Sequence, residues 1–295
     1  MASCPVCGGA RTGVYFKGRE HTLSRDAFGP SRTEVAMGDV LRCGDCGLGF
    51  TALRPADGQL AEFYREMDVG VYEGELPGRL RTARRHLAIL NRCYRGRPGR
   101  LLEVGCASGR FLDLTCNAGW ECTGVEPSEV LCGEARRVLG DRARVIGSTL
   151  QDAGLAEGAF DVVAMFDVLE HVPEPVGFLH LVASFIKPGG MLLMNLPDLD
   201  SPQARLLGRR WPLLLPEHLN YFNKPSLSQV ARSAGLRRVT WGRRPGAFSA
   251  GFVLYRLSQH DIPGVQWVHR WFSPIIGKLV VPVYMGELWS VWRKG

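Results

Sequence analysis

The stretch Leu101-Leu-Glu-Val-Gly-Cys-Ala-Ser-Gly109 (LLEVGCASG) decides the fold of this chain of 295 residues. Its start is an apolar run typical of a buried strand, and residues 110–118 after it have the pattern of a helix. Glycines at 105 and 109 let the backbone approach a ligand closely, where the helix N-terminus offers unpaired N–H groups. The stretch therefore predicts a nucleotide-binding α/β fold.

A carboxylate after the next strand supports this interpretation. Residues 121–125 read as a second strand, and Glu126 follows it, 21 residues after Gly105. A carboxylate at this place can accept both ribose hydroxyls of a nucleoside. Dehydrogenases that bind nucleosides this way carry a GxGxxG loop, whereas here the glycines are four apart and Glu103 precedes the first by two residues. We therefore expect Glu103 to meet a cationic amino group rather than a pyrophosphate.

Strand and helix patterns alternate over residues 100–195. The expected strands are 101–104, 121–125, 144–146, 161–166 and 191–195, the expected helices are 110–118, 128–139 and 176–186, and 187–190 reads as a turn. A basic amphipathic helix is expected at 80–94 and another helix at 226–233, with final strands at 236–241 and 288–292. Strands spaced by helices imply right-handed βαβ units, and therefore a parallel sheet covered on both faces.

Two cysteine pairs near the N-terminus predict a metal site. Cys4-Pro-Val-Cys7 and Cys43-Gly-Asp-Cys46 are CxxC pairs with 35 residues between them. Each pair can turn two sulfurs toward one point, and two pairs complete a tetrahedral four-sulfur site that suits zinc. Because four thiolates leave no open coordination position, we expect a structural Zn²⁺ and a ribbon that depends on it for folding.

The segment from Leu101 to Pro197 closely resembles the class I methyltransferases that use S-adenosylmethionine (SAM). The matching stretches are LLEVGCASG, GVEPS, FDVVAMFDVLEHV, FIKPGGMLLMNLP and, further on, PEHLNYF. The resemblance implies a Rossmann-like sheet of seven strands, with SAM as the cofactor. The ribbon followed by this domain also resembles a subgroup of bacterial biosynthetic methyltransferases.

The resemblance assigns the cofactor contacts. Gly105 and Gly109 would pack against the methionine part of SAM, and Glu126 would hold the ribose. Ala107 stands where many members carry a third glycine, which is a departure from the pattern. The full expected cofactor set is Tyr72, Glu103, Gly105, Gly109, Glu126, Pro127, Thr149, Leu150 and Asp167, with Thr149 and Leu150 bordering the adenine.

The chain is expected to contain three parts. Residues 1–55 form the zinc ribbon, and residues 56–98 form a helical linker or cap that begins with a short helix at 56–67. Residues 99–295 form the SAM-binding domain, with a substrate-cap insertion around 198–225 and an apolar C-terminal segment. The fold class is therefore α/β with a small N-terminal ribbon and an inserted, partly C-terminal cap.

Three ionisable residues are the catalytic candidates. Glu170 and His171 follow the fourth strand, at the carboxyl end of the sheet where the reactive methyl group would lie. The alternative is that they only cap the next loop and helix. His218 is the third candidate, or else a structural histidine. Oxygen methylation needs a base for the hydroxyl proton, which suits a histidine, whereas carbon methylation of an alkene would favour Glu170.

The insertion suggests the substrate. Arg209 and Arg210 stand beside Trp211, and arginines bind phosphates while an aromatic wall suits apolar or ring-shaped groups. Asn220 and Tyr221 complete the expected substrate-binding set. An anionic small molecule with an apolar or ring-shaped body is expected. The specific expectation is a prenyl diphosphate, which would make the chain similar to geranyl diphosphate C-methyltransferases and could bring Mg²⁺ with the substrate.

Other functions stay open at this stage. The alternatives are C-methylation of a nucleotide sugar and O-methylation of a phenol or quinone. A net charge of +7 with a ribbon also fits a ribosomal RNA methyltransferase, but the arginines are dispersed and the expected base-recognition motif is missing. A scaffold without activity is a further rival, which the intact glycine loop argues against.

The N-terminal residues have no apolar core typical of a signal peptide, and no run of apolar residues predicts a membrane span, so a cytoplasmic location is expected. In that setting the nine cysteines are expected to be thiols or metal ligands rather than disulfides. Whether the chain forms a homo-oligomer is left open.

Overall fold

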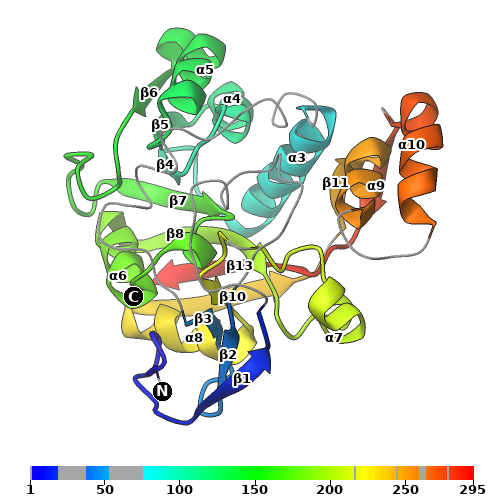
Figure 1. The fold of residues 1–295 in the computed structure, drawn as a ribbon. Helices are drawn as coiled ribbons and strands as arrows, with labels where there is room; N and C mark the ends of the chain where they lie inside the picture. Colours follow the sequence, from blue (N-terminus) through cyan, green and yellow to red (C-terminus); the bar gives the residue numbers. More distant parts are fainter. Residues whose placement is uncertain are drawn as a thin grey trace.

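The computed structural model describes residues 2–18, 38–52, 76–215, 217–243, 245–258, 264–277 and 279–295. Its centre is a seven-stranded sheet in the order β10-β13-β8-β7-β4-β5-β6 (Figure 1). The five strands from β6 to β8 run parallel, whereas β13 is antiparallel to both of its neighbours. This order and mixture of directions confirms the predicted class I methyltransferase sheet. The strands are β4 (Arg100–Val104), β5 (Glu121–Val125), β6 (Ala143–Ile146), β7 (Phe160–Phe166), β8 (Ile186–Pro197), β10 (Leu236–Gly242) and β13 (Glu287–Lys294).

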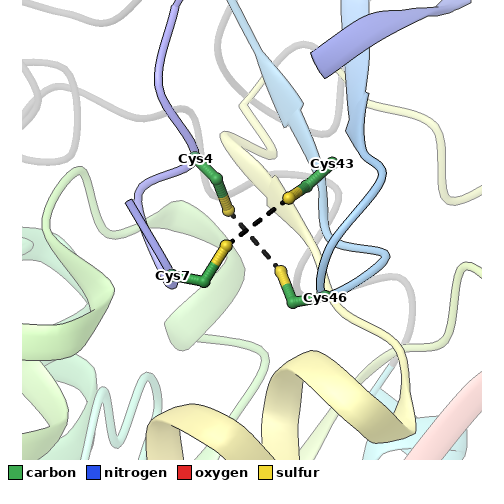
Figure 2. Close-up of side chains that lie close together, drawn as sticks. All are labelled: Cys4, Cys7, Cys43 and Cys46. Carbon is green, nitrogen blue, oxygen red and sulfur yellow. Dashed lines mark hydrogen bonds between the residues drawn. The ribbon is translucent and has the colours of Figure 1, made fainter. Parts of the chain in front are cut away.

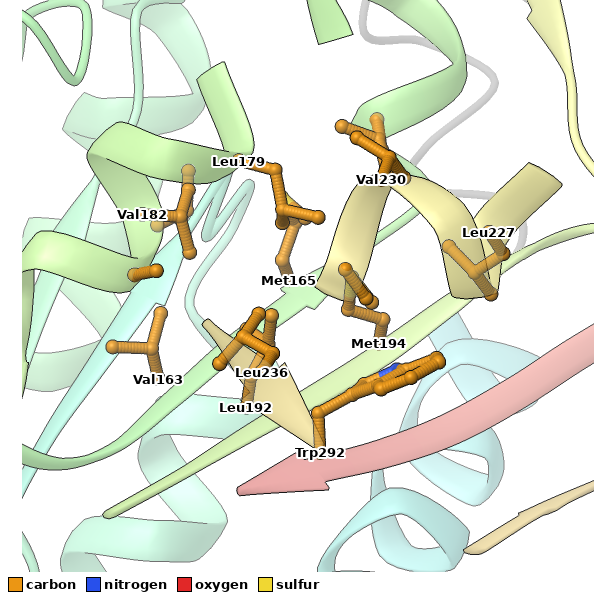
Figure 3. Packing of buried hydrophobic residues seen from close by; sticks show 14 of the residues in the cluster. Val163, Met165, Leu179, Val182, Leu192, Met194, Leu227, Val230, Leu236 and Trp292 are labelled. Carbon is orange, nitrogen blue, oxygen red and sulfur yellow. The ribbon is translucent and has the colours of Figure 1, made fainter. Parts of the chain in front are cut away.

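Helices cover both faces of the sheet. One face packs against α3 (Leu76–Cys93), α4 (Arg110–Asn117) and α5 (Glu129–Leu139), and the other against α6 (Pro175–Phe185) and α8 (Lys224–Ser233). The residues of β7 show why both faces need a cover. Val162 and Ala164 pack in a first core with α3, α4 and α5, whereas Val163 and Met165 pack in a second core with α6 and α8. Figure 3 shows the second core, where Val163 and Met165 meet side chains from α6 and α8. A strand that is apolar on both faces can only be stable between two helical layers.

The segment from Lys187 to Gly190 differs from the prediction of a turn. It lies inside β8 as an irregularity: Phe160 pairs with Ile186 and Val162 pairs with Met191, so between these pairs one residue of β7 lies opposite four residues of β8. Gly189 takes a φ of 76°, and a Cβ on Gly190 would lie 2.9 Å from the Asp161 carbonyl oxygen. The two glycines therefore let β8 bulge and continue rather than end.

The N-terminal ribbon consists of β1 (Thr12–Phe16), β2 (Val40–Cys43) and β3 (Gly49–Thr51). Its sheet has the order β1-β2-β3-β9, and the fourth strand, β9 (Asn220–Tyr221), comes from the far side of the sequence. Leu48 and Phe50 of the ribbon share a core cluster with Phe222. The ribbon is thus packed onto the methyltransferase domain, beside α8 (Figure 1).

The insertion after β8 and the C-terminal segment form the remaining elements. The first contains α7 (Pro202–Leu207) and a 3-10 turn (Gly208–Arg210). The second contains β11 (Gly246–Ser249), α9 (Ala250–Ser258), α10 (Val265–Ile276) and β12 (Val280–Val283), with β11 antiparallel to β12. This small sheet is attached to α3, since Arg81 donates to the Val280 carbonyl oxygen at 3.3 Å.

Two further predictions can be placed only in part. Among the described helices, none combines the length and the apolarity needed to cross a membrane. The predicted helix at 56–67 and the boundary between residues 55 and 56 lie outside the described residues. The division into three parts therefore stays a prediction.

Candidate active site

The loop after β4 has the shape that its glycines predict. Gly105 and Gly109 both take positive φ angles, 70° and 73°, which side chains disfavour. A Cβ on Gly105 would lie 2.7 Å from the Val168 side chain, and one on Gly109 would lie 2.9 Å from Leu139. Both glycines are therefore required by conformation and by space. Ala107 also has a positive φ, 46°, so the departure at this position carries some backbone strain.

Glu126 holds this loop in place. Its two carboxylate oxygens accept hydrogen bonds from the backbone N–H groups of Ala107 and Ser128, each at 2.9 Å. Burial raises the pKa of the carboxyl, and the two amides oppose that shift. The side chain thus joins the glycine loop to the start of α5, at the position predicted for a ribose-binding carboxylate.

Glu103 is the orphan carboxylate of the same loop. It is buried, and its Oε2 atom has no hydrogen-bond partner among the described residues. Burial, followed by the nearby Glu126, raises its pKa well above the ordinary value. A buried acceptor without a donor costs about 1–3 kcal/mol, and a cationic amino group would satisfy it. The glycine loop, Glu126 and Glu103 together fit SAM.

The other predicted cofactor residues surround this loop. Asp167 directly follows β7 and has a φ of 54°, and its Oδ1 accepts from the Asn195 side chain at 3.0 Å. Solvent reaches Asp167, yet dense protein around it raises its pKa, a shift that Asn195 opposes. Leu150 is buried, and the Thr149 hydroxyl donates to Asp152 at 2.6 Å.

Two members of the predicted cofactor set remain. Pro127 is half-buried between Glu126 and the start of α5, whereas Tyr72 lies outside the described residues. The cofactor contacts of the full set remain predictions.

The three predicted catalytic residues come together. Glu170, His171 and His218 place one ligand atom each within 4.8 Å of one another, so the group could hold a metal ion or move a proton. Glu170 and His171 lie in a 3-10 turn (Leu169–His171) after β7, and His218 lies in the loop before β9. The two imidazole rings have centroids 4.7 Å apart at 78°.

Backbone carbonyls determine which nitrogen of each histidine ring carries a hydrogen. Nδ1 of His171 lies 3.0 Å from the Glu217 carbonyl oxygen, and Nδ1 of His218 lies 2.9 Å from that of Leu213. Because a carbonyl only accepts, each Nδ1 carries the hydrogen and Nε2 is the acceptor nitrogen of the neutral ring. Burial lowers the pKa of His171 to about 4, so this ring is neutral at pH 7.

Glu170 is deeply buried, and neither carboxylate oxygen has a partner in the part of the chain that the structure describes. Burial, and then the nearby Asp167, raises its pKa well above the ordinary value. A carboxyl of this kind holds its proton until a positive charge appears beside it. The cluster is therefore able to respond to a proton that arrives on a neighbouring histidine.

Two residues near the site were missed by sequence reasoning. Burial, and then Asp167, raises the pKa of Glu287 at the start of β13 to about 8. His86 of α3 stacks on Phe166 at the end of β7, with ring centroids 3.9 Å apart. Its spacing from Ile89 and Leu90 already places His86 on the buried face of the helix, so that signal was present. No sequence signal marked Glu287.

The predicted substrate residues do not form one wall. Arg209 and Arg210 are exposed, whereas Trp211 has no exposed surface and donates its indole N–H to the Met285 carbonyl oxygen at 2.7 Å. Asn220 and Tyr221 are also buried and donate to the carbonyl oxygens of Val172 (2.6 Å) and Leu215 (2.8 Å) respectively. The structure separates the arginines from the aromatic ring, and the substrate contacts stay a prediction.

The four N-terminal cysteines converge on one point (Figure 2). The Cys4 and Cys46 sulfurs are 3.6 Å apart, the Cys7 and Cys43 sulfurs are 3.5 Å apart, and all four lie within 4.8 Å of one another. Sulfurs bound tetrahedrally to one zinc ion at about 2.3 Å would lie about 3.8 Å apart. The near-tetrahedral cluster therefore could bind a metal ion of that size.

Comparisons with known proteins agree with the fold. The profile of a family described as "Methyltransferase domain" matches residues 72–240, and the chain belongs to this family. A solved complex between the Haloferax volcanii Trm112 methyltransferase activator and the putative methyltransferase matches with a TM-score of 0.56 and 15% identity, covering 81% of this chain and 99% of that one. A putative methyltransferase from Bacillus halodurans matches with a TM-score of 0.53 and 13% identity, covering 71% and 98%. The fold is that of a class I SAM-dependent methyltransferase.

Curated relatives are more specific in name. A ubiquinone biosynthesis O-methyltransferase from Aromatoleum aromaticum is 28% identical over 148 residues, which are 46% of this chain and 63% of the relative. One from Alkalilimnicola ehrlichii is 33% identical over 163 residues, 51% of this chain and 66% of the relative. The matches thus span less than two thirds of the length of these relatives.

Proposed function

We propose that the chain methylates the oxygen of a small phenolic or quinone-type acceptor, with SAM as the methyl donor. The observation that carries this proposal is the Glu170–His171–His218 cluster after the carboxyl end of β7, where Val168 lies against Gly105 of the glycine loop. The similarity to ubiquinone biosynthesis O-methyltransferases supports the same chemistry. O-methylation, an alternative in the sequence analysis, thereby replaces C-methylation of a prenyl diphosphate as the preferred reaction.

The cofactor and the structural metal have separate places. Glu103, Glu126 and the two loop glycines would hold SAM, which supplies an electrophilic methyl group when bound. Cys4, Cys7, Cys43 and Cys46 would hold a structural Zn²⁺. Four thiolates fill the coordination sphere, so this metal would take no part in methyl transfer.

His218 is the proposed base for oxygen methylation, because burial lowers the pKa of the other histidine, His171, to about 4 and makes that ring a weak base. The acceptor hydroxyl loses its proton as its oxygen gains the methyl group, and Nε2 of a neutral histidine can take that proton. Glu170 lies in the same cluster and, as a carboxylate, would stabilise the imidazolium that forms; the neighbouring positive charge lowers the pKa of this buried carboxyl, and its own proton would pass to solvent. Neutral His171 would then act as a hydrogen-bonding neighbour.

The charges around the cluster favour a neutral acceptor. Burial, and then Asp167, raise the pKa values of both Glu170 and Glu287, so ionisation of Glu170 beside a protonated histidine already places a negative charge close to Asp167. A diphosphate would add negative charge to this group, and like charges at close range are unfavourable. The exposed Arg209 and Arg210 do not belong to the cluster. A phenol or catechol brings no net charge and suits this environment better.

The test is a methyl-transfer assay with labelled SAM. The acceptors are a set of catechols and phenols, geranyl diphosphate, a nucleotide sugar and ribosomal RNA, with an unrelated zinc-ribbon protein as the blank. Label should appear on a catechol or phenol oxygen, and His218→Asn should lose turnover while its SAM affinity stays within about twofold. Transfer to geranyl diphosphate or RNA alone would contradict the proposal.

A further inference from the structure

Strand β9 lies between the ribbon and the 3-10 turn at Leu169–His171, which we call the catalytic turn because it carries two of the catalytic candidates. On one side it pairs with β3, where Gly49 is opposite Tyr221 and Phe50 is opposite Asn220, and the Thr51 N–H donates to the Leu219 carbonyl oxygen at 3.0 Å. On the other side the Leu219 N–H donates to the Glu170 carbonyl oxygen at 2.8 Å. One short strand thus joins the metal ribbon to the backbone of a candidate catalytic residue.

Side chains reinforce the same connection. The Asn220 amide donates to the Val172 carbonyl oxygen, directly after the catalytic turn, at 2.6 Å. The His171 ring bonds to the Glu217 carbonyl oxygen, so the loop before β9 also orients one of the two histidines. Any movement of residues 217–221 would therefore move the ring of His171, the ring of His218 and the backbone at Glu170.

Asp200 provides a further link between the ribbon and the segment around β9. Its Oδ1 accepts from Arg42 of β2 at 2.8 Å, and its Oδ2 accepts from Asn223, the N-cap of α8, at 2.9 Å. Burial would raise the pKa of the Asp200 carboxyl, but these two bonds and the charges of Arg42 and Arg205 outweigh it and lower that pKa. Asn223 lies two residues after the end of β9. The Asp200 carboxylate therefore connects strand β2 of the ribbon to the segment that follows β9.

The contact between the ribbon and the domain is also close-packed. A Cβ on Gly49 would lie 2.7 Å from the Leu199 side chain, and one on Gly47 would lie 2.5 Å from the Asn223 side chain. Glycine at both positions lets the ribbon backbone approach the domain at van der Waals distance. Together with the shared core around Phe50 and Phe222, this leaves little freedom for the ribbon to slide.

We propose that the ribbon is a positioning element for the acceptor site: the strands that the four cysteines hold together keep β9 against the catalytic turn, with Arg42 and Asp200 as the positioning residues. This inference rests on the proposed function for its link to turnover, but not for its structural claim. Loss of the metal should loosen residues 217–222 and the turn at 169–171. The glycine loop and Glu126, which make no contact with β9 in the bonds described above, should keep their affinity for SAM.

The test compares amide hydrogen exchange in the full metal-loaded chain and two variants. Arg42→Met removes the bond to Asp200 and keeps an apolar stem. Arg11→Met is the matched control, because Arg11 pairs with Asp45 within the ribbon, on an exposed surface. Loss of a charge-assisted bond corresponds to about a tenfold change in a local opening equilibrium. We expect exchange at 217–222 to rise about tenfold in Arg42→Met and to be unchanged in Arg11→Met.

Metal removal and kinetics complete the test. Stripping the metal with a chelator should raise exchange in the same peptides, and adding zinc back should restore it. For an acceptor that is methylated, Arg42→Met should lower kcat several-fold with an unchanged Kd for SAM, and Arg42→Lys should recover part of the loss. Native exchange rates at 217–222 after metal removal would overturn the proposal. The exchange data decide it even if no acceptor is methylated, a result that would count only against the proposed function.

Discussion

Replacement of Glu170 by glutamine gives a sharp test of the site because it should change stability and turnover in opposite directions. The side chain is 1% exposed, and its pKa in the folded chain is raised by burial and by Asp167. In the unfolded chain a glutamate titrates near its ordinary value of about 4.3. The folded state therefore keeps a proton on Glu170 that the unfolded state loses.

The sign of the stability change follows from this difference. Below about pH 4 both states are protonated, and the carboxyl has its full stability contribution. As the pH rises above the unfolded pKa, the free energy of unfolding falls by about 1.4 kcal/mol per pH unit until the folded pKa is reached. Glutamine cannot ionise, so Glu170→Gln should become progressively more stable than the wild type as the pH rises.

The assay is denaturant unfolding of both proteins without SAM between pH 4 and pH 9, followed by turnover measurements. Turnover should fall by about 10²–10⁴-fold, because the charge that stabilises the protonated histidine is lost. Glu134→Gln is the control: the hydrogen bond from Arg137 lowers the pKa of Glu134, so both the folded and the unfolded chain hold this carboxyl ionised above about pH 5, and its replacement should give a stability difference that is nearly constant from there to pH 9. A stability difference for Glu170→Gln that stays constant across this pH range would refute the reasoning.

Three further changes test other parts of the structure. Glu126→Ala should weaken SAM binding by at least tenfold in titration calorimetry, because the glycine loop loses the carboxylate that holds it and the expected ribose contact; an unchanged affinity would mean that the site is misplaced. Ala107→Gly should raise the free energy of unfolding by about 0.5 kcal/mol, since relief of a positive φ outweighs the added freedom of the unfolded chain. Trp211→Phe should lower it by about 1–3 kcal/mol, because the Met285 carbonyl oxygen loses its donor; wild-type stability with impaired turnover would instead favour a substrate role.

Features of the fold that depend on neighbouring residues could be predicted from the sequence. The strand at 121–125 and the helix at 128–139 were placed within a residue, because apolar periodicity and Ser128, whose hydroxyl caps α5, act locally. The positive φ angles at Gly105 and Gly109 follow from the same local logic. The place of Glu126 could be predicted since a parallel strand order fixes where two successive strands end.

Features that depend on distant partners could not be predicted. Asn220 and Tyr221 read as polar and aromatic site residues, but they form an edge strand whose partner lies about 170 residues earlier in the chain. Trp211 reads as the wall of a pocket because nothing in its neighbourhood shows the Met285 carbonyl oxygen that binds it. Glu287 comes close to Asp167 and Glu170 because β13 pairs antiparallel with β8, a pairing between distant parts of the sequence.

The shared sheet also limits how the chain can be shortened. Removing residues 1–52 would leave β9 with unpaired N–H and C=O groups and would bare Phe222 and Leu227, which now pack in one core with the ribbon. An uncovered strand edge next to apolar surface invites association with other chains. A catalytic fragment without its N-terminal part should therefore precipitate or form aggregates, and engineering that exchanges this part between relatives must transfer the facing residues with it.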